Sequence, residues 1–171
     1  QLTDVETEIN GLFTYDRAVR KVDRARIVAI NRGDFSRIPV EEEVVPTSET
    51  APRTWRYTFA SPGADWFRPT FDDRPWKEGP GGFGTRETPG AVVRTVWDTK
   101  TIWIRRNVDL PAGPADNLYL RMHHDEDAEV YLNGVLAARV SGYTTGYEVV
   151  PIRPEARKAL KPGRNLVAVH C

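Results

Sequence analysis

The stretch "EVYLNGVLAARV", residues 129–140, predicts a β-hairpin and gives the first indication of the fold. Asn133-Gly134 supplies the two residues with positive φ that a type I′ turn needs between two β-strands. Because successive residues of a strand point to opposite faces, Val130 and Leu132 are predicted to face a core. The alternate residues, Glu129 and Tyr131, are predicted to face outward.

Further strand-like segments surround this hairpin over most of residues 50–171. Each alternates or is rich in β-branched and aromatic residues, and turns such as "SPGAD" and "KPGRN" separate them. Only "PEARKAL" has a helical pattern. Many short strands with frequent turns favour a mainly β fold, a β-sandwich or jelly roll, over a parallel α/β sheet. The other predicted strands are "TWRYTF", "TIWIRRNVDL", "NLYLRMHH" and "NLVAVHC".

Residues 1–46 have a different pattern. "LTDVETEINGLFT" predicts a strand end and a turn, and "VDRARIVAIN" predicts an amphipathic helix. The acidic, proline-containing segment that follows predicts a linker. A strand, a turn and a helix bury too little apolar surface to fold alone. We therefore interpret residues 1–46 as the remnant of a larger domain plus linker, and 47–171 as a β-module. Both ends stop inside alternating segments, so we expect a fragment of a longer protein, with the module truncated at its C-terminal end.

The composition argues against two classes of partner. Lys and Arg together number 24, as do Asp and Glu, so the net charge is zero. A neutral chain has no basic field to attract nucleic acid or an anionic membrane. No apolar run has the length of a membrane span. The sequence therefore predicts neither nucleic acid nor a membrane as partner.

The segment "HHDED", residues 123–127, raises the question of a metal site. Asp125, Asp127 and Glu129 offer oxygens of the kind that Ca²⁺ prefers, but an EF-hand glycine and distal glutamate are missing. Adjacent histidines on a strand point to opposite faces, which disfavours zinc. We favour a tight reversal in which the acidic side chains cap backbone N–H groups, and we predict no cofactor.

The aromatic residues suggest a ligand. Flat aromatic faces stack on the apolar C–H faces of sugar rings, although tryptophan also packs the core of small β-domains. Trp55 and Trp103 lie in regular strand patterns and are predicted to be core residues. Others lie in or beside polar loops, "FDDRPW" and "SGYTTGY", where either packing or sugar binding would account for them. The candidate carbohydrate-binding residues are Trp66, Asp73, Trp76, Tyr143 and Tyr147.

No catalytic constellation is visible in the sequence. A G-x-S-x-G motif is absent, and Cys171 is the last residue, with no room for partners downstream. Glycoside hydrolysis requires two carboxyl groups that face each other across a pocket, which the adjacent Asp72 and Asp73 cannot do. We predict that this chain is not itself catalytic.

The stretch "TDVETEINGLFTYDR" resembles the segment that closes the catalytic (β/α)₈ barrel of glycoside hydrolase family 2. The resemblance implies that residues 1–32 are the last strand, loop and helix of such a barrel. Family members that act on glucuronides carry Asn-x-Lys in this turn. Asn10 matches the asparagine, but Leu12 stands in place of the lysine. The resemblance thus implies a substrate-contacting Asn10 and a β-galactosidase-like parent, whose catalytic glutamates would lie upstream.

The segments "WFRPTFDDRPWKEGPGGFG", "IWIRRNVDL", "DEDAEVYLNG" and "LKPGRNLVAVH" resemble the galactose-binding-like jelly-roll modules attached to many such hydrolases. The resemblance implies this fold and leaves a structural Ca²⁺ open. We therefore expect an accessory module of a retaining β-glycosidase that binds oligo- or polysaccharide, with the missing barrel as partner in the same chain. The alternative is a non-binding structural domain that packs on the barrel or mediates oligomer contacts. Relatives that degrade polysaccharides imply a periplasmic or extracellular location.

Overall fold

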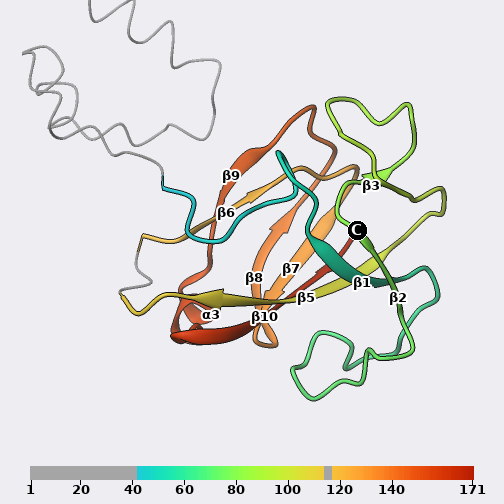
Figure 1. Cartoon of the computed structure of the whole chain (residues 1–171). Helices are drawn as coiled ribbons and strands as arrows, with labels where there is room; N and C mark the ends of the chain where they lie inside the picture. Colours follow the sequence, from blue (N-terminus) through green and yellow to red (C-terminus); the bar gives the residue numbers. More distant parts are fainter. Residues whose placement is uncertain (1–41, 114–116) are drawn as a thin grey trace, which may run out of the picture. The chain divides into compact units, whose positions relative to one another are not determined.

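The computed structural model describes residues 42–113 and 117–171 (Figure 1). The compact unit within this part of the chain runs from Glu43 to Cys171. It thus includes residues 43–46, which the sequence assigns to a linker. Asn10 and the predicted turn and helix of the barrel remnant lie outside the described residues.

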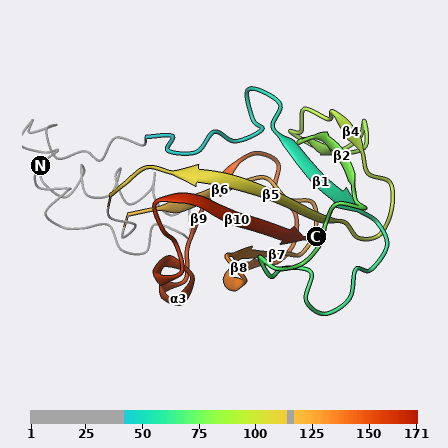
Figure 2. The ribbon, with the colours of Figure 1, turned by 60° about the horizontal axis from the view of Figure 1, so that its bottom comes forward.

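A six-stranded sheet, in the order β2-β1-β5-β10-β7-β8, forms the main layer, and every neighbouring pair in it is antiparallel. The two longest strands, β5 and β10, pair along their whole length in its middle (Figure 2). They correspond to "TIWIRRNVDL" and "NLVAVHC", so these sequence predictions are confirmed. The strands are β1 (Thr54–Thr58), β2 (Lys77–Pro80), β5 (Trp103–Leu110), β7 (Ala128–Leu132), β8 (Val135–Val140) and β10 (Gly163–His170).

A second, smaller layer consists of β6 (Tyr119–Met122) and β9 (Glu148–Pro151), which pair antiparallel. Their apolar side chains, with the buried Ala156 of α3 (Pro154–Lys158), pack on one face of the main sheet to form the core. A short parallel pair, β3 (Phe83–Gly84) and β4 (Thr95–Val96), lies apart from both layers in the pairing scheme. The predicted mainly β sandwich is thus confirmed. The core residues on the main sheet include Val130, Leu132, Ala137, Ala138, Val167 and Val169.

The predicted hairpin is present, with one correction. Asn133 and Gly134 both have positive φ, 50° and 88°, as the type I′ turn requires. Val130 and Leu132 are buried at 3% and 4% exposure, so their inward orientation is confirmed. Tyr131 lies on the opposite face of the sheet but is only half exposed to solvent, because a long loop covers it.

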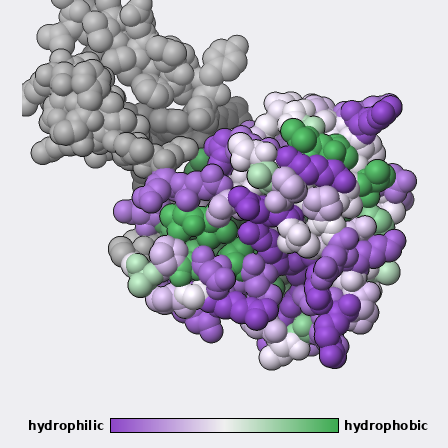
Figure 3. Space-filling view, viewed as in Figure 1, coloured by the Kyte–Doolittle hydropathy of each residue, from purple (hydrophilic) through white to green (hydrophobic). Residues whose placement is uncertain are grey.

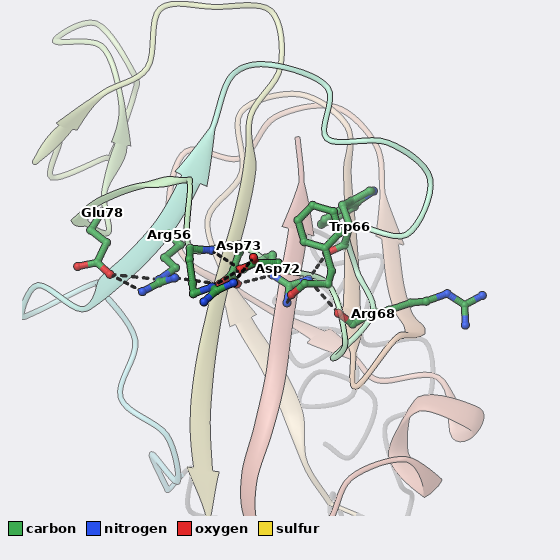
Figure 4. A network of polar contacts seen from close by, with 9 residues as sticks. Arg56, Trp66, Arg68, Asp72, Asp73 and Glu78 are labelled. Carbon is green, nitrogen blue, oxygen red and sulfur yellow. Dashed lines mark hydrogen bonds and ion pairs between the residues drawn. The ribbon is translucent and has the colours of Figure 1, made fainter.

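That loop, residues 59–76 between β1 and β2, is held on the sheet by the buried Arg105. Trp66, Arg68 and Asp73 of the loop lie in the network of polar contacts drawn in Figure 4. The side chain of Arg105 is 3% exposed, and its Nε donates a hydrogen bond of 2.7 Å to Oδ2 of Asp73. Its Nη1 donates to the main-chain carbonyls of Trp66 and Arg68. The other oxygen of Asp73 accepts from Arg56 at 3.1 Å. One carboxylate in the loop therefore joins β1 and β5.

Aromatic rings complete this attachment. The Arg105 guanidinium lies over the ring of Phe71, 5.2 Å from its centroid. Trp66 is 8% exposed and meets Tyr131 edge-on at 5.5 Å, while Phe67 stacks on the same tyrosine at 4.4 Å. Aromatic pairs at such separations add to the stabilisation that burial provides. The loop thus covers the face of the main sheet opposite to the core.

We expect the Asp73→Asn variant to unfold at a lower urea concentration than the neighbouring Asp72→Asn variant. The first change leaves the buried Arg105 without its counter-charge, which costs on the order of 3 kcal/mol of unfolding free energy. Within the described residues, the ion pair of Asp72 is with the exposed Arg74, so loss of the Asp72 charge is expected to leave the stability nearly unchanged. Urea unfolding followed by tryptophan fluorescence measures both. Equal midpoints for the two variants would contradict the structural role assigned to Arg105.

Stability is also expected to depend on pH through His170. Its ring stacks on Trp103 at 4.6 Å, and burial lowers its pKa below the ordinary 6.5, with Glu129 opposing part of this shift. The folded state therefore binds a proton less readily than the unfolded chain, so stability falls as the pH drops below about 6.5. Urea midpoints at pH 7.5 and 5.5 measure the fall. His170→Gln is expected to reduce it, and an undiminished fall would refute this origin.

Candidate functional site

A polar hollow of about 450 Å³ lies on the loop-covered face of the main sheet. Its floor includes Asn107 of β5 and Leu166 of β10, which are register partners, and Arg105 lies on the same face two residues from Asn107. This volume falls within the range of about 300–1,000 Å³ that is typical of ligand pockets. The remaining lining residues are Pro69, Phe71, Asp73, Asn133, Ala159, Lys161 and Arg164.

One wall of the hollow is the loop that Arg105 holds. Pro69, Phe71 and Asp73 come from this segment. Phe71 is half-buried and meets Trp76 edge-on, with 5.7 Å between the ring centroids. The guanidinium of Arg105 lies over the Phe71 ring. Because the loop backbone is bonded to the sheet at several points, the position of this wall is set by the fold and does not need a ligand to form.

The other wall, residues 159–164, is held by two asparagines. Asn133, in the hairpin turn, donates from Nδ2 to the carbonyl of Ala159 and to Oδ1 of Asn165, each at 2.7 Å. Asn165, only 1% exposed, accepts from the N–H of Lys161 at 3.1 Å and donates to its carbonyl at 2.7 Å. Leu166 donates its N–H to Oδ1 of Asn133 at 2.8 Å. This network fixes the backbone that carries Lys161.

The accessible polar groups of the hollow are cations and an amide. Asn107, Lys161 and Arg164 are all exposed. Over residues 42–113 and 117–171, neither Lys161 nor Arg164 forms an ion pair. Asp73, by contrast, is 19% exposed and shared between two arginines. Groups that remain exposed around a preformed hollow can bind hydroxyl or acidic groups of a ligand.

The structure places the predicted site residues in different surroundings. Asp73 lines the hollow, and the half-buried Trp76 lies beside Phe71. Trp66 is enclosed by Phe67 and Tyr131, so its ring has no free face for stacking. The structure thus brings one of the predicted residues to the hollow directly and places a second against Phe71, which lines it.

Tyr143 and Tyr147 lie elsewhere. Both come from the segment between β8 and β9, and neither lines the hollow. Tyr143 is 62% exposed. Tyr147 is half-buried, lies near His123 and near Arg121 of β6, and has a pKa raised chiefly by burial. The five candidate residues of the module therefore do not form one site.

The "HHDED" segment is held by backbone contacts. His123 Nε2 lies 2.9 Å from the carbonyl of Thr144, and His124 Nδ1 lies 2.8 Å from that of Glu126. Asp127 accepts the N–H of Gly142 at 2.8 Å, as a capping carboxylate does. Within the described ranges, no group of three His, Cys, Asp or Glu side chains is placed to hold a metal ion. Likewise, no helix in this part of the chain is long and apolar enough to cross a membrane.

Other surface features fit a ligand less well. A second hollow, of about 110 Å³, is mainly apolar and smaller than ordinary ligand pockets; Leu110 and Leu118 are among its lining residues. On the face seen in Figure 3, hydrophobic residues form separate patches between hydrophilic ones. The larger polar hollow is therefore the candidate functional site.

Asn165→Ala is expected to loosen the wall that carries Lys161. The substitution leaves the N–H and carbonyl of that loop without their partners, at a cost of about 2 kcal/mol of unfolding free energy. Urea unfolding measures the loss. Asn117→Ala, the same change at an exposed position before β6, is the matched control and is expected to leave the midpoint unchanged. A stable Asn165→Ala variant would show that the loop is held by other contacts.

Comparison with known proteins gives structural likenesses only. No known protein family and no curated protein matches the sequence. A Faecalibacterium prausnitzii β-glucuronidase is similar with 21% identity and a TM-score of 0.48, over 78% of this chain and 22% of that one. A β-glucuronidase from an uncultured Clostridium sp. gives 16% identity and a TM-score of 0.49, over 78% and 23%. A β-glycosidase from Bacteroides vulgatus gives 18% and 0.47, over 70% and 16%. This chain spans less than a quarter of their lengths.

Proposed function

We propose that the described unit is an accessory carbohydrate-binding module and that the polar hollow is its binding site. The observation that carries the proposal is the hollow itself, about 450 Å³ in volume, with walls fixed by Arg105 and by Asn165. A site formed before binding loses less conformational entropy when a ligand enters it. The hollow is large enough to accept one or two sugar rings, and its lining offers polar groups to their hydroxyls.

The groups at the hollow suit sugar hydroxyls. The Asn107 amide both donates and accepts hydrogen bonds, as a hydroxyl partner must. Arg164 offers a planar set of donors that can meet two oxygens at once. The half-buried Phe71, together with Trp76 beside it, supplies apolar surface for the C–H side of a ring. Asp73 contributes mainly by holding the wall, since both of its oxygens already accept from arginines.

The parent protein in this proposal is a retaining β-glycosidase similar to glycoside hydrolase family 2. Support comes from the sequence stretch "TDVETEINGLFTYDR", in which Asn10 would contribute to the rim of the barrel. Leu12, in place of a lysine, favours a β-galactosidase-like specificity. The catalytic barrel of the same chain and a glycan outside the cytoplasm are the partners that this proposal entails. Tyr143, exposed on another side of the module, would serve a separate glycan contact.

A non-binding structural domain is the second candidate function. It is favoured by the enclosure of Trp66 and by the use of Asp73 in the attachment of the loop, because both residues then serve folding. In that case the hollow would be filled by another domain of the parent or by solvent. A direct binding measurement separates the two functions.

We expect the 171-residue chain to be retarded in affinity electrophoresis by at least one plant or algal polysaccharide. Asn107→Ala is expected to weaken the retardation at least fivefold, because it removes hydrogen bonds to the ligand without disturbing the strand backbone. Asn117→Ala is the matched control and should bind as the unchanged chain does. Thermal midpoints of all three establish that each is folded.

Two results would count against the proposal. If a folded chain is retarded by no polymer, the structural-domain function is favoured. If Asn107→Ala binds like the control, the module binds glycans at another place, and the exposed Tyr143 becomes the next position to test.

A further inference from the structure

The polar hollow carries an excess of positive charge. Its lining includes three cations, Arg105, Lys161 and Arg164, against one carboxylate, Asp73. Arg56 pairs with Asp73 and Glu78, and Arg105 pairs with Asp73, so two positive and two negative groups balance each other. Lys161 and Arg164, by contrast, form no ion pair inside the described part of the chain. The whole sequence has equal numbers of acids and bases, so this excess is local.

The two cations are carried by rigid backbone. Asn165 binds both the N–H and the carbonyl of Lys161, and Arg164 belongs to the first residues of β10. Asp109 lies opposite Arg164 in the register with β5 but forms no ion pair with it in the structure described. Elsewhere on the surface, arginines such as Arg121 and Arg139 are paired with glutamates. The anchored backbone keeps both side chains at the hollow, and their charged groups remain exposed to solvent.

From this arrangement we infer that the hollow selects a sugar unit that bears an anionic substituent, a carboxylate or a sulfate ester. The inference rests on the proposed carbohydrate-binding function and specifies its ligand class. A neutral sugar would gain hydrogen bonds from Asn107 and contact with Phe71 but would leave the two cations unused. An acidic group between Lys161 and Arg164 gains charge-assisted hydrogen bonds, which are stronger than those between neutral groups.

The expected size of the preference for an anionic ligand follows from the solvent exposure of Lys161 and Arg164. Interactions between exposed charges are individually weak and are screened by salt. Two such cations acting on one anion are expected to raise affinity about tenfold over an uncharged ligand of the same shape. The preference should diminish when the salt concentration rises from 50 to about 300 mM, because the screening length shortens.

The test uses ligands that differ only in charge. The 171-residue chain is titrated with polygalacturonate and with its methyl-esterified form, and with a sulfated galactan and its desulfated form. The double substitution Lys161→Gln and Arg164→Gln is compared with Lys100→Gln and Arg86→Gln, which removes the same charge at exposed positions that do not line the hollow. We expect the acidic ligand of one pair to bind about tenfold more tightly, the hollow double variant to lose this preference, and the control to keep it.

Each outcome has a distinct meaning. Preference within the galacturonate pair identifies a carboxylate, and preference within the galactan pair identifies a sulfate. Equal binding of charged and neutral forms overturns the acidic-sugar inference and leaves the carbohydrate-binding function in place. No binding of any polymer by the folded chain overturns both. Loss of preference in the control variant as well would show a diffuse attraction by net charge, which also overturns the assignment to Lys161 and Arg164.

Discussion

The buried guanidinium of Arg105 is the constraint on which the loop-covered face depends. Moving such a group out of water is costly unless its donors are satisfied, and a guanidinium has five of them. Arg105 donates four hydrogen bonds, to Asp73 and to the backbone carbonyls of Trp66, Arg68 and Phe71, the last at 3.4 Å. Since all these acceptors belong to one loop, satisfying a single side chain determines how residues 66–73 lie. The hollow lies between that loop and the wall of residues 159–164, and it keeps its form because Arg105 fixes the loop.

Much of the fold follows from local sequence patterns, and the elements that do so could be predicted. Asn133-Gly134 specifies its turn by backbone preference alone, and the alternation of Leu118, Leu120 and Met122 specifies which side of β6 packs on the core. Strands β2 and β9 escaped prediction because "KEGP" and "EVVP" are short and contain proline. Their strand conformation comes from partners far away in the sequence, β1 and β6, and no local signal reports such pairing.

The candidate site was less accessible to sequence reasoning. Asp73 could be proposed because acidic residues next to aromatic ones are conspicuous. Trp66 has the same polar surroundings in the sequence, yet its burial is decided by Tyr131, 65 positions later, and by Arg105. Asn107 and Arg164 read as ordinary surface residues of two strands. Only the register of β5 with β10, together with the anchored 159–164 loop, brings them to one hollow.

Arg105 grips the loop largely through carbonyl oxygens, which every amino acid possesses. Apart from Phe71, whose ring lies against the Arg105 guanidinium, the side chains at positions 69 to 72 are therefore under weaker constraint than the path of the backbone that carries them. Homologous modules could exchange these side chains, and with them the shape and chemistry of one wall, while the scaffold stays intact. Because contacts to the backbone hold the loop while its side chains line the hollow, one architecture can diversify its ligands through point substitutions, without insertions or deletions.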